Sequence, residues 1–315
     1  MSRFDSPVDL IGNTPLLDVS ALSPNPNVTL LVKLEGYNPG GSVKDRIARS
    51  MILVAEADGS LTPGHVIIES SSGNTGIGLA LVARSRGYQL KVVLPENVSP
   101  ERRQLLEIYG AEIISSPGSE GSNGAVKVAQ KLAADNPEWW YPYQYANPAN
   151  VDAHYSGTGP EIWRDCPEIT HFVAGLGTSG TLLGVGRYLK EQNAAVQIWA
   201  VEPPAGEMVD GLKNLDEGYI PPIFIDFGGA ELLNRKRMVG ARESIEGVRT
   251  LSSIGLLVGL STGAAFVGAT KCAAEIESGT VVFLSADGAW KYLSSGAWTG
   301  DLDEVTERAR KTLYF

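Results

Sequence analysis

The sequence is poor in the residues that build disulfide frameworks and metal centres. It has only two cysteines among 315 residues, Cys166 and Cys272, which lie far apart and outside any CxxC pattern. Its three histidines, His65, His154 and His171, show no metal-ligand spacing and no partnered Asp or Ser motif. We therefore expect no disulfide framework, no metal site and no histidine-based triad, and so few cysteines fit a reducing cytoplasm.

Positive charge and long apolar runs are also scarce. The chain has 26 Lys and Arg against 36 Asp and Glu, which gives a net charge of −10 and a pI near 4.9. This sign repels phosphate backbones and anionic lipids, so we expect neither a nucleic-acid nor a membrane partner. No run approaches eighteen apolar residues, and residues 1–13 lack the uninterrupted apolar core of a signal peptide. We expect a protein that is not exported.

The chain does have the length and the alternation of an α/β protein. Its 315 residues suggest roughly two domains, and 43% hydrophobic residues suffice for a core in each. Short β-branched runs alternate with segments of helical period, which predicts parallel strands joined by crossover helices in two doubly wound domains. The Asn-, Pro- and Gly-rich stretch 144–161 separates two sets of these units, and we place a boundary near Ala146.

The expected elements are set by period and by flanking glycines. The strands are 28–35, 65–70, 89–95, 112–116, 141–145, 171–174, 196–202, 256–260 and 280–285. The helices are 75–86, 100–109, 123–134, 180–191, 241–254 and 262–276.

The stretch NPGGSVKDR, residues 38–46, is a Gly-rich turn that opens a helix with Lys44 in its first turn. The positive end of a helix dipole disfavours an ammonium and lowers its pKa, as a Schiff-base nucleophile requires. A solvated KDR triplet at a helix start is the structural alternative.

The stretch ESSSGNTG, residues 69–76, joins a predicted strand to a predicted helix. Hydroxyls, an amide and the backbone N–H groups of a helix start form a neutral anion trap that suits a carboxylate. Ligands of open α/β sheets bind at the carboxyl ends of strands, which favours this interpretation over ordinary helix caps.

The stretch GLGTSGT, residues 175–181, also follows a strand, opens a helix and satisfies GxGxxG. Glu202 ends the next strand, about where a dinucleotide fold places its ribose-binding acid, so an NAD-dependent dehydrogenase is a candidate. The same backbone and hydroxyls can instead hold a single phosphate. The motif alone does not decide between them.

Two weaker candidates lie where the same pocket should be. Ser261 opens another helix after a short apolar run, and Gln144 ends the aromatic run WWYPYQY. A helix cap and a half-exposed strand end are the structural alternatives for these two residues.

Taken in order, the motifs resemble one family of enzymes. Lys44 in GSVKDR, then SSGNTG, GLGTSGT and GLSTGAA, are similar to the pyridoxal-phosphate enzymes of the tryptophan-synthase β class, fold type II, and specifically to the cysteine synthases. The stretches IGNTPLL, QYANPAN, GTGPEIW and DGAWKYLSSG extend the resemblance over nearly the whole chain. It is strongest to cysteine synthase B and to the actinobacterial O-phosphoserine sulfhydrylases.

The resemblance implies a role for each motif. Lys44 would form the Schiff base with pyridoxal 5'-phosphate, Asn74 would face the ring oxygen of the cofactor, and Ser261 would face its pyridine nitrogen. The cofactor phosphate would be held by Gly177, Thr178, Ser179, Gly180 and Thr181. The substrate carboxylate would be held by Ser71, Ser72, Thr75 and Gln144.

The implied organisation places the cofactor in a cleft between two domains of a homodimer subunit. Residues 1–40 and 146–315 would form the larger domain that binds the cofactor phosphate. Residues 41–145 would form a smaller, mobile domain that carries the SSGNTG loop. The chain departs from the family pattern at Ser70 and Ser71, where Pro-Thr is usual, and at Ile47, where Pro is usual.

The implied reaction is cysteine synthesis by β-replacement. Lys44 would remove the α-proton of an O-activated serine, the leaving group would depart to give an α-aminoacrylate, and a sulfur nucleophile would add. Sulfide or a thiocarboxylated sulfur-carrier protein would supply the sulfur.

Lys213 bears on which activated serine is used. Related O-phosphoserine enzymes have an arginine at the matching position, and Lys213 keeps the charge but loses the bidentate fork. We expect it to pair with a substrate phosphate, although Asp210, Asp216 and Glu217 can neutralise it at the surface.

Other functions remain open at this point. A serine/threonine dehydratase and a diaminopropionate synthase share the first half of the chemistry. A dehydrogenase and a non-catalytic amino-acid or nucleotide-binding module share the α/β architecture.

Overall fold

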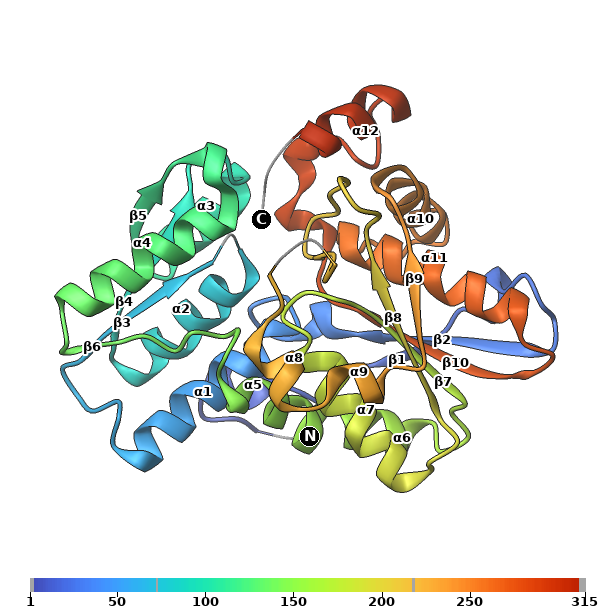
Figure 1. The fold of residues 1–315 in the computed structure, drawn as a ribbon, viewed down its shortest axis with the longest axis horizontal. Coiled ribbons are helices and arrows are strands. Elements are labelled where there is room, and N and C mark those ends of the chain that lie inside the picture. Colours follow the sequence, from blue (N-terminus) through green and yellow to red (C-terminus); the bar gives the residue numbers. More distant parts are fainter. Residues whose placement is uncertain (1–2, 72, 217–218, 312–315) are drawn as a thin grey trace.

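The computed structural model describes residues 3–71, 73–216 and 219–311, which form two mostly parallel sheets with helices around them (Figure 1). In Figure 1 the smaller sheet and its helices lie at the left and the larger sheet at the right. Segment 66–140 makes the smaller sheet, whereas the larger one combines strands from both ends of the described chain. The expected α/β class with mostly parallel sheets is confirmed. The domain limits at residues 40 and 146 stay a prediction.

The larger sheet has six strands in the order β1-β2-β10-β7-β8-β9. Only the pairing of β1 with β2 is antiparallel among these neighbours. The strands are β1 (Leu16–Asp18), β2 (Val28–Leu34), β7 (His171–Gly175), β8 (Gln197–Glu202), β9 (Arg235–Met238) and β10 (Gly279–Ser285).

The smaller sheet has four parallel strands in the order β5-β4-β3-β6. They are β3 (Val66–Ser70), β4 (Gln89–Pro95), β5 (Glu112–Ser116) and β6 (Trp139–Trp140).

Helices cover both sheets (Figure 1). They are α1 (Lys44–Asp58), α2 (Asn74–Arg86), α3 (Pro100–Ile108), α4 (Gly121–Asp135), α5 (Pro148–Ala153), α6 (Gly159–Asp165), α7 (Gly180–Gln192), α8 (Pro222–Asp226), α9 (Gly229–Leu232), α10 (Ala241–Ser253), α11 (Leu260–Glu275) and α12 (Leu302–Lys311). Within the described ranges, no helix is long and apolar enough to cross a membrane.

The near-continuous apolar run of β10 is explained by burial on both faces. Val281 and Phe283 pack into one hydrophobic cluster, and Val282 and Leu284 pack into another on the opposite face. Alternate side chains of a strand point to opposite faces, so a strand between two helix layers is apolar at every position. This is the doubly wound arrangement that the sequence predicted.

Two expected strands are wrong. Residues 141–145 form no strand, because Pro142 lacks an N–H group and Tyr143 has a positive φ of 46°, and the short β6 precedes them. Residues 256–260 form only an isolated bridge at Val258, after Gly255 with its positive φ of 83°, and α11 begins at Leu260. In both places a short apolar run was insufficient evidence for a strand.

The sequence analysis also missed β1 and β9, which lie at the two edges of the larger sheet. β1 has three residues, and β9 reads Arg-Lys-Arg-Met. Edge strands are short or charged because one of their edges meets solvent, and they therefore lack the apolar signature of central strands.

Candidate active site

A pocket lies between the two sheets, at the carboxyl ends of their strands. From the smaller sheet it is lined by Ser70 and Ser71 at the end of β3 and by Asn74 and Thr75 at the start of α2. From the larger sheet it is lined by the turn after β7, the loop after β8, Ser261 and Ala286. This is where open α/β sheets bind ligands.

Lys44 is the first residue of α1 and lies in the wall of this pocket. It also lines an adjoining hollow that reaches Gly177, Ser179 and Thr181, so it stands between the two halves of the site. Loss of water contact lowers the pKa of its ammonium to about 8, against the opposing charge of Asp287. A lysine with a pKa near neutrality has the free amine that a nucleophile and a base require.

A buried ionic network fixes the helix that begins at Lys44. Arg46 donates from Nε to Glu35 Oε2 at 2.6 Å and from Nη2 to Glu161 Oε2 at 2.7 Å, and Lys33 Nζ lies 2.8 Å from the same Glu161 oxygen. Although burial raises the pKa of Glu161, the hydrogen bonds and charges of Arg46 and Lys33 hold it at about 2. The network joins α1 to β2 and to α6, and it therefore fixes the position of the backbone from which the Lys44 side chain extends.

The turn between β3 and α2 is the first of two polar turns at the pocket. Its backbone is organised from within, because Ser71 Oγ accepts hydrogen bonds from the N–H groups of Gly73 at 3.2 Å and Gly76 at 3.0 Å. Thr75 Oγ1 donates to Gln144 Oε1 at 2.7 Å. The structure thus brings together Ser71, Thr75 and Gln144, as expected for the carboxylate site, whereas Ser72 lies outside the described residues.

Glu69 supports this turn from below. Its carboxylate accepts hydrogen bonds from Ser70 N at 2.8 Å and Gln144 N at 3.3 Å, and its side chain is inaccessible to solvent. Burial raises the pKa of Glu69 to about 8. The carboxyl group therefore joins the turn to the segment that carries Gln144.

The turn between β7 and α7 is the second polar turn. Ser179 holds a positive φ of 75°, is buried, and its Oγ has no hydrogen-bond partner within the described part of the chain. A Cβ at Gly180 would lie 2.0 Å from Asn150 Oδ1, so no side chain fits there. Thr178 Oγ1 accepts from Asn150 Nδ2 at 3.1 Å, and Thr181 Oγ1 lies 3.3 Å from His154 Nε2.

This second turn fits a phosphate. A helix of 13 residues begins at Gly180, and Thr178, Ser179 and Thr181 around its start line a hollow together with the buried, unpartnered Ser179 hydroxyl. The first N–H groups of a helix have no partner within it and can bind an anion. A strained residue whose buried hydroxyl lacks an acceptor is expected where a permanently bound anion completes the site. Lys44 and Ser261 line the same hollow, as a bound pyridoxal phosphate requires.

Asn74 and Ser261 both line the pocket, but their surroundings differ. Asn74 Nδ2 donates to Asp287 Oδ2 at 2.7 Å, and its Oδ1 accepts from Lys291 Nζ at 2.7 Å. Asn74 Nδ2 also lies 3.4 Å from the Tyr292 hydroxyl, and this longer contact is the one that a cofactor oxygen would replace. Ser261 lies beside Gly211, where an added Cβ would sit 3.4 Å from Ser261 Oγ, and it is the second residue of α11 rather than its cap.

Lys213 points into the pocket from the loop after β8. Its Nζ lies over the rings of Tyr145 at 4.6 Å and Tyr219 at 5.1 Å, and burial lowers its pKa to about 8. Two of the acidic neighbours that could neutralise it are engaged elsewhere, since Asp210 pairs with Arg102 and Asp216 with Lys236. The third, Glu217, lies outside the described residues. Lys213 is therefore a half-buried side chain of the pocket wall, and its pairing with a substrate phosphate stays a prediction.

Glu202 does not have the setting of a ribose-binding acid. Its carboxylate is fully buried, lies 2.8 Å from Lys236 Nζ and accepts a hydrogen bond from Leu215 N at 3.2 Å. It fixes the loop that carries Lys213 instead of pointing toward a ligand. The match of the GxGxxG spacing to a dinucleotide fold is thus incidental.

Several residues of the pocket were missed by sequence reasoning. Arg102 and Asp210 form an ion pair in its wall, and Tyr292 lies beside them with its ring 4.8 Å from the Arg102 guanidinium. Asp287 and Lys291 hold Asn74. Tyr292, Asp287 and Lys291 belong to DGAWKYLSSG, a stretch that carried the family resemblance, so that motif was the available signal.

Comparison with solved structures supports this arrangement. O-acetyl serine sulfhydrylase isoform 3 from Entamoeba histolytica is 31% identical, with a TM-score of 0.87 over 98% of this chain and 96% of that chain. O-ureido-L-serine synthase is 34% identical, with a TM-score of 0.88 over 96% of this chain and 99% of that chain.

Comparison with curated relatives gives the same result. Cysteine synthase B of Pseudomonas aeruginosa is 41% identical over 94% of this chain and 98% of the relative. Cysteine synthase B of Escherichia coli is 40% identical over 91% of this chain and 94% of the relative. The family model described as pyridoxal-phosphate dependent enzyme matches residues 8–287. The chain therefore belongs to the pyridoxal-phosphate dependent enzymes, as a cysteine synthase of fold type II.

Proposed function

We propose that this cysteine synthase acts on an O-activated L-serine whose preferred form is O-phosphoserine, with O-acetylserine as the alternative. The observation that carries the preference is Lys213, a half-buried cation in the pocket wall whose described acidic neighbours, Asp210 and Asp216, are paired elsewhere. A dianionic leaving group gains a charge-assisted contact there that a neutral acetyl group does not. The sulfhydrylase name of the solved neighbour supports O-acetylserine instead, so the preference needs a direct test.

The described residues divide the work of β-replacement between the two turns. Pyridoxal phosphate, when bound, supplies the electron sink that lets a proton leave the α-carbon of an amino acid. Lys44 Nζ accepts that proton, because it stands in the wall between the two halves of the site. Ser71, Thr75 and Gln144 hold the substrate carboxylate, and the turn after β7 holds the cofactor phosphate. Ser261 faces the ring nitrogen with a hydroxyl, and Asn74 faces the ring oxygen.

The sulfur donor and the assembly are also proposals. Sulfide or a thiocarboxylated sulfur-carrier protein supplies sulfur, and the change of Pro-Thr to Ser70-Ser71 alters closure over the substrate. A homodimer is also proposed, because the family resemblance implies one. Sedimentation velocity of the purified protein tests that assembly.

The deciding experiment measures turnover with O-phosphoserine and O-acetylserine side by side, each with sulfide and with a thiocarboxylated donor. Lys213→Ala is expected to lower kcat/KM for O-phosphoserine roughly ten- to a hundredfold, or about 1.5–3 kcal/mol, and to leave O-acetylserine nearly unchanged. Lys213→Arg should retain the preference, because it keeps the charge. Lys271→Ala removes an exposed lysine paired with Glu243 and serves as the control. Equal losses with both substrates in Lys213→Ala would refute the assignment.

A further inference from the structure

The pocket wall contains a carboxylate that the reaction does not explain. Among the described residues that line the pocket, Lys44, Arg102 and Lys213 are cationic and Asp210 is the single acid. The side chains of Asp210 and Arg102 are 6% and 4% exposed, and they form an ion pair. Burial raises the pKa of the Asp210 carboxyl, and the Arg102 charge opposes that shift. A buried acid beside the binding place of an anionic substrate weakens that binding, so its presence needs a reason.

The position of the pair makes it part of the substrate site. Arg102 comes from α3, one of the helices around the smaller sheet. It packs on the first polar turn, where a Cβ at Gly73 would lie 2.8 Å from Arg102 Cδ. Asp210 comes from the loop after β8 of the larger unit, three residues before Lys213. The pair therefore crosses the pocket from one side of the cleft to the other, above the turn that holds Ser71.

Each member of the pair is held so that the other can be exchanged. Arg102 Nε donates to Ser99 Oγ at 3.2 Å, and the Arg102 guanidinium lies over the Tyr292 ring, so its position does not depend on Asp210 alone. The loop of Asp210 is fixed by Lys213 N, which donates to Leu176 O at 2.7 Å, and by the buried Leu212. A guanidinium with fixed geometry is the group that binds a phosphate in bidentate fashion.

From these contacts we infer that Asp210 and Arg102 set the selectivity of the pocket for the charge of the leaving group. Asp210 occupies the Arg102 guanidinium in the substrate-free pocket, and a phosphate group has to take its place. Arg102 and Lys213 then form the two cationic sides of the phosphate subsite, and Asp210 lowers the affinity of that subsite for dianions. The assignment rests on the proposed O-phosphoserine specificity, which Arg102 and Lys213 favour and the Asp210 charge opposes.

Asp210→Asn is the informative variant, because an asparagine oxygen still accepts a hydrogen bond from Arg102 while the negative charge is lost. The first measurement is competitive inhibition of O-acetylserine turnover by inorganic phosphate, with holoenzyme saturated in pyridoxal phosphate. We expect the inhibition constant to fall roughly tenfold in Asp210→Asn and to rise several-fold in Arg102→Lys, which loses the fork. The second measurement is the ratio of kcat/KM for O-phosphoserine to that for O-acetylserine, which should rise in Asp210→Asn by a similar factor.

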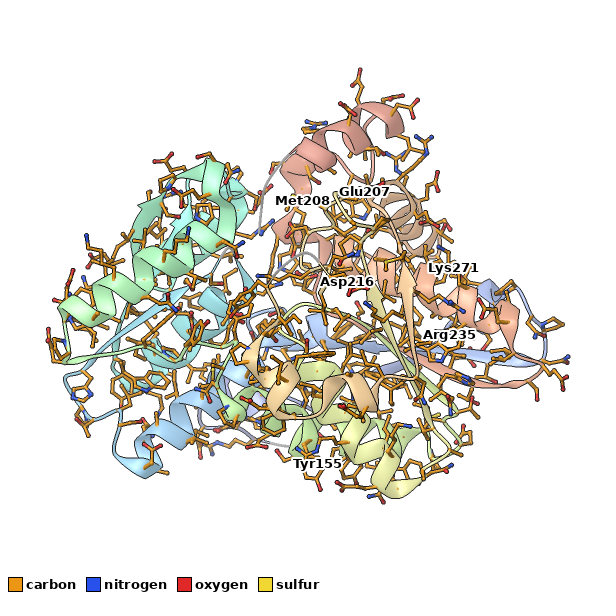
Figure 2. The ribbon with its side chains drawn as sticks, viewed as in Figure 1. Tyr155, Glu207, Met208, Asp216, Arg235 and Lys271 are labelled. Carbon is orange, nitrogen blue, oxygen red and sulfur yellow. The ribbon has the colours of Figure 1, made fainter. Side chains whose placement is uncertain are left out.

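Asp216→Asn is the matched control. Asp216 lies on the same loop, is 68% exposed in its side chain and pairs with the surface Lys236 (Figure 2). Its replacement should change neither the phosphate inhibition constant nor the substrate ratio.

The outcomes separate this inference from the proposed function. If Asp210→Asn tightens phosphate inhibition but no variant uses O-phosphoserine, the pair is confirmed and the proposed substrate is wrong. If wild type prefers O-phosphoserine and Asp210→Asn changes neither measurement, the pair is only a structural bridge and the inference is overturned. Should Asp210→Asn fail to fold, Arg102→Lys decides alone, and an unchanged inhibition constant in that variant also overturns the inference.

Discussion

The two polar turns of the site have the same local design but differ in the hydrogen bonds that their hydroxyl groups make. Each follows a parallel strand and opens a helix, after β3 and after β7. In the first, Ser71 Oγ accepts two N–H groups of its own turn, and the hydroxyl of Thr75 already has a partner. In the second, Thr178 Oγ1 accepts the N–H of Gly180 at 3.4 Å, but Ser179 holds a strained φ and a buried hydroxyl without a partner in the described chain.

We propose that this difference separates a site for a permanent ligand from a site for a transient one. A turn that satisfies its own donors is stable without a ligand and can release one in every catalytic cycle. A turn with unsatisfied buried donors gains stability when an anion stays bound. On the proposed assignment, cofactor and substrate are distinguished by whether the protein completes its own hydrogen bonds.

The largest expected effect comes from the residue between the two turns. Lys44→Ala should lower cysteine formation by orders of magnitude, because the same amine serves both halves of the site. Turnover with saturating pyridoxal phosphate is the measurement, and Lys271→Ala is the matched surface control (Figure 2). Retention of more than about a tenth of wild-type kcat, a deficit under roughly 1.4 kcal/mol, would contradict the role of Lys44.

The next effect tests the rigidity of the second turn. Gly180→Ala places a Cβ 2.0 Å from Asn150 Oδ1, so the turn must shift, at a cost of about 1–3 kcal/mol. We expect weaker retention of pyridoxal phosphate in equilibrium dialysis. Gly76→Ala in the first turn is the comparison, since its nearest contact would be Val92 Cγ1 at 3.2 Å and a small shift accommodates it. Equal loss of cofactor in both variants would remove the distinction between the turns.

A smaller effect is expected from the first turn. Ser71→Ala removes the acceptor of two backbone N–H groups and should lower kcat/KM for the activated serine about tenfold, with cofactor content unchanged. Ser71→Thr keeps a hydroxyl and should restore most of the activity. Release of pyridoxal phosphate from Ser71→Ala would show that the first turn also serves the cofactor.

The smallest expected effect is on stability and concerns Glu69, which supports that turn. Because the pKa of Glu69 is raised to about 8 in the folded protein, folding binds a proton between pH 4.5 and 8. The contribution of Glu69 to stability is therefore present at low pH and is lost as the pH rises through this window. In urea denaturation at pH 5 and pH 8, Glu69→Gln should show a smaller loss of unfolding free energy than wild type. An identical loss in both proteins would mean that Glu69 keeps an ordinary pKa.

Local chemistry made much of the site predictable. Glycine and hydroxyl residues in the sequence indicated the turns that carry Lys44, Ser71, Ser179 and Ser261. All four residues line the pocket or the hollow that adjoins it. The central strands were predicted because burial on both faces makes them apolar at every position.

The rest depends on contacts between distant parts of the chain. Arg102 and Asp210 are 108 residues apart, and neither stands in a turn with a legible pattern. The ion pair forms only in the folded protein, where α3 and the loop after β8 lie on opposite sides of the pocket. The edge strands β1 and β9 were missed, and the prediction for residues 256–260 was wrong, for a related reason. The structure of a short run depends on the elements packed beside it.

The order of the strands in the larger sheet bears on how the chain assembles as it is made. Strand β2, residues 28–34, pairs in parallel with β10, residues 279–285. This pairing cannot form until almost the whole chain has been synthesised. The four strands of the smaller sheet all lie within residues 66–140 and can associate while the rest is still being synthesised. The closure of the larger sheet is then a late event, and the site between the sheets comes into being only with it.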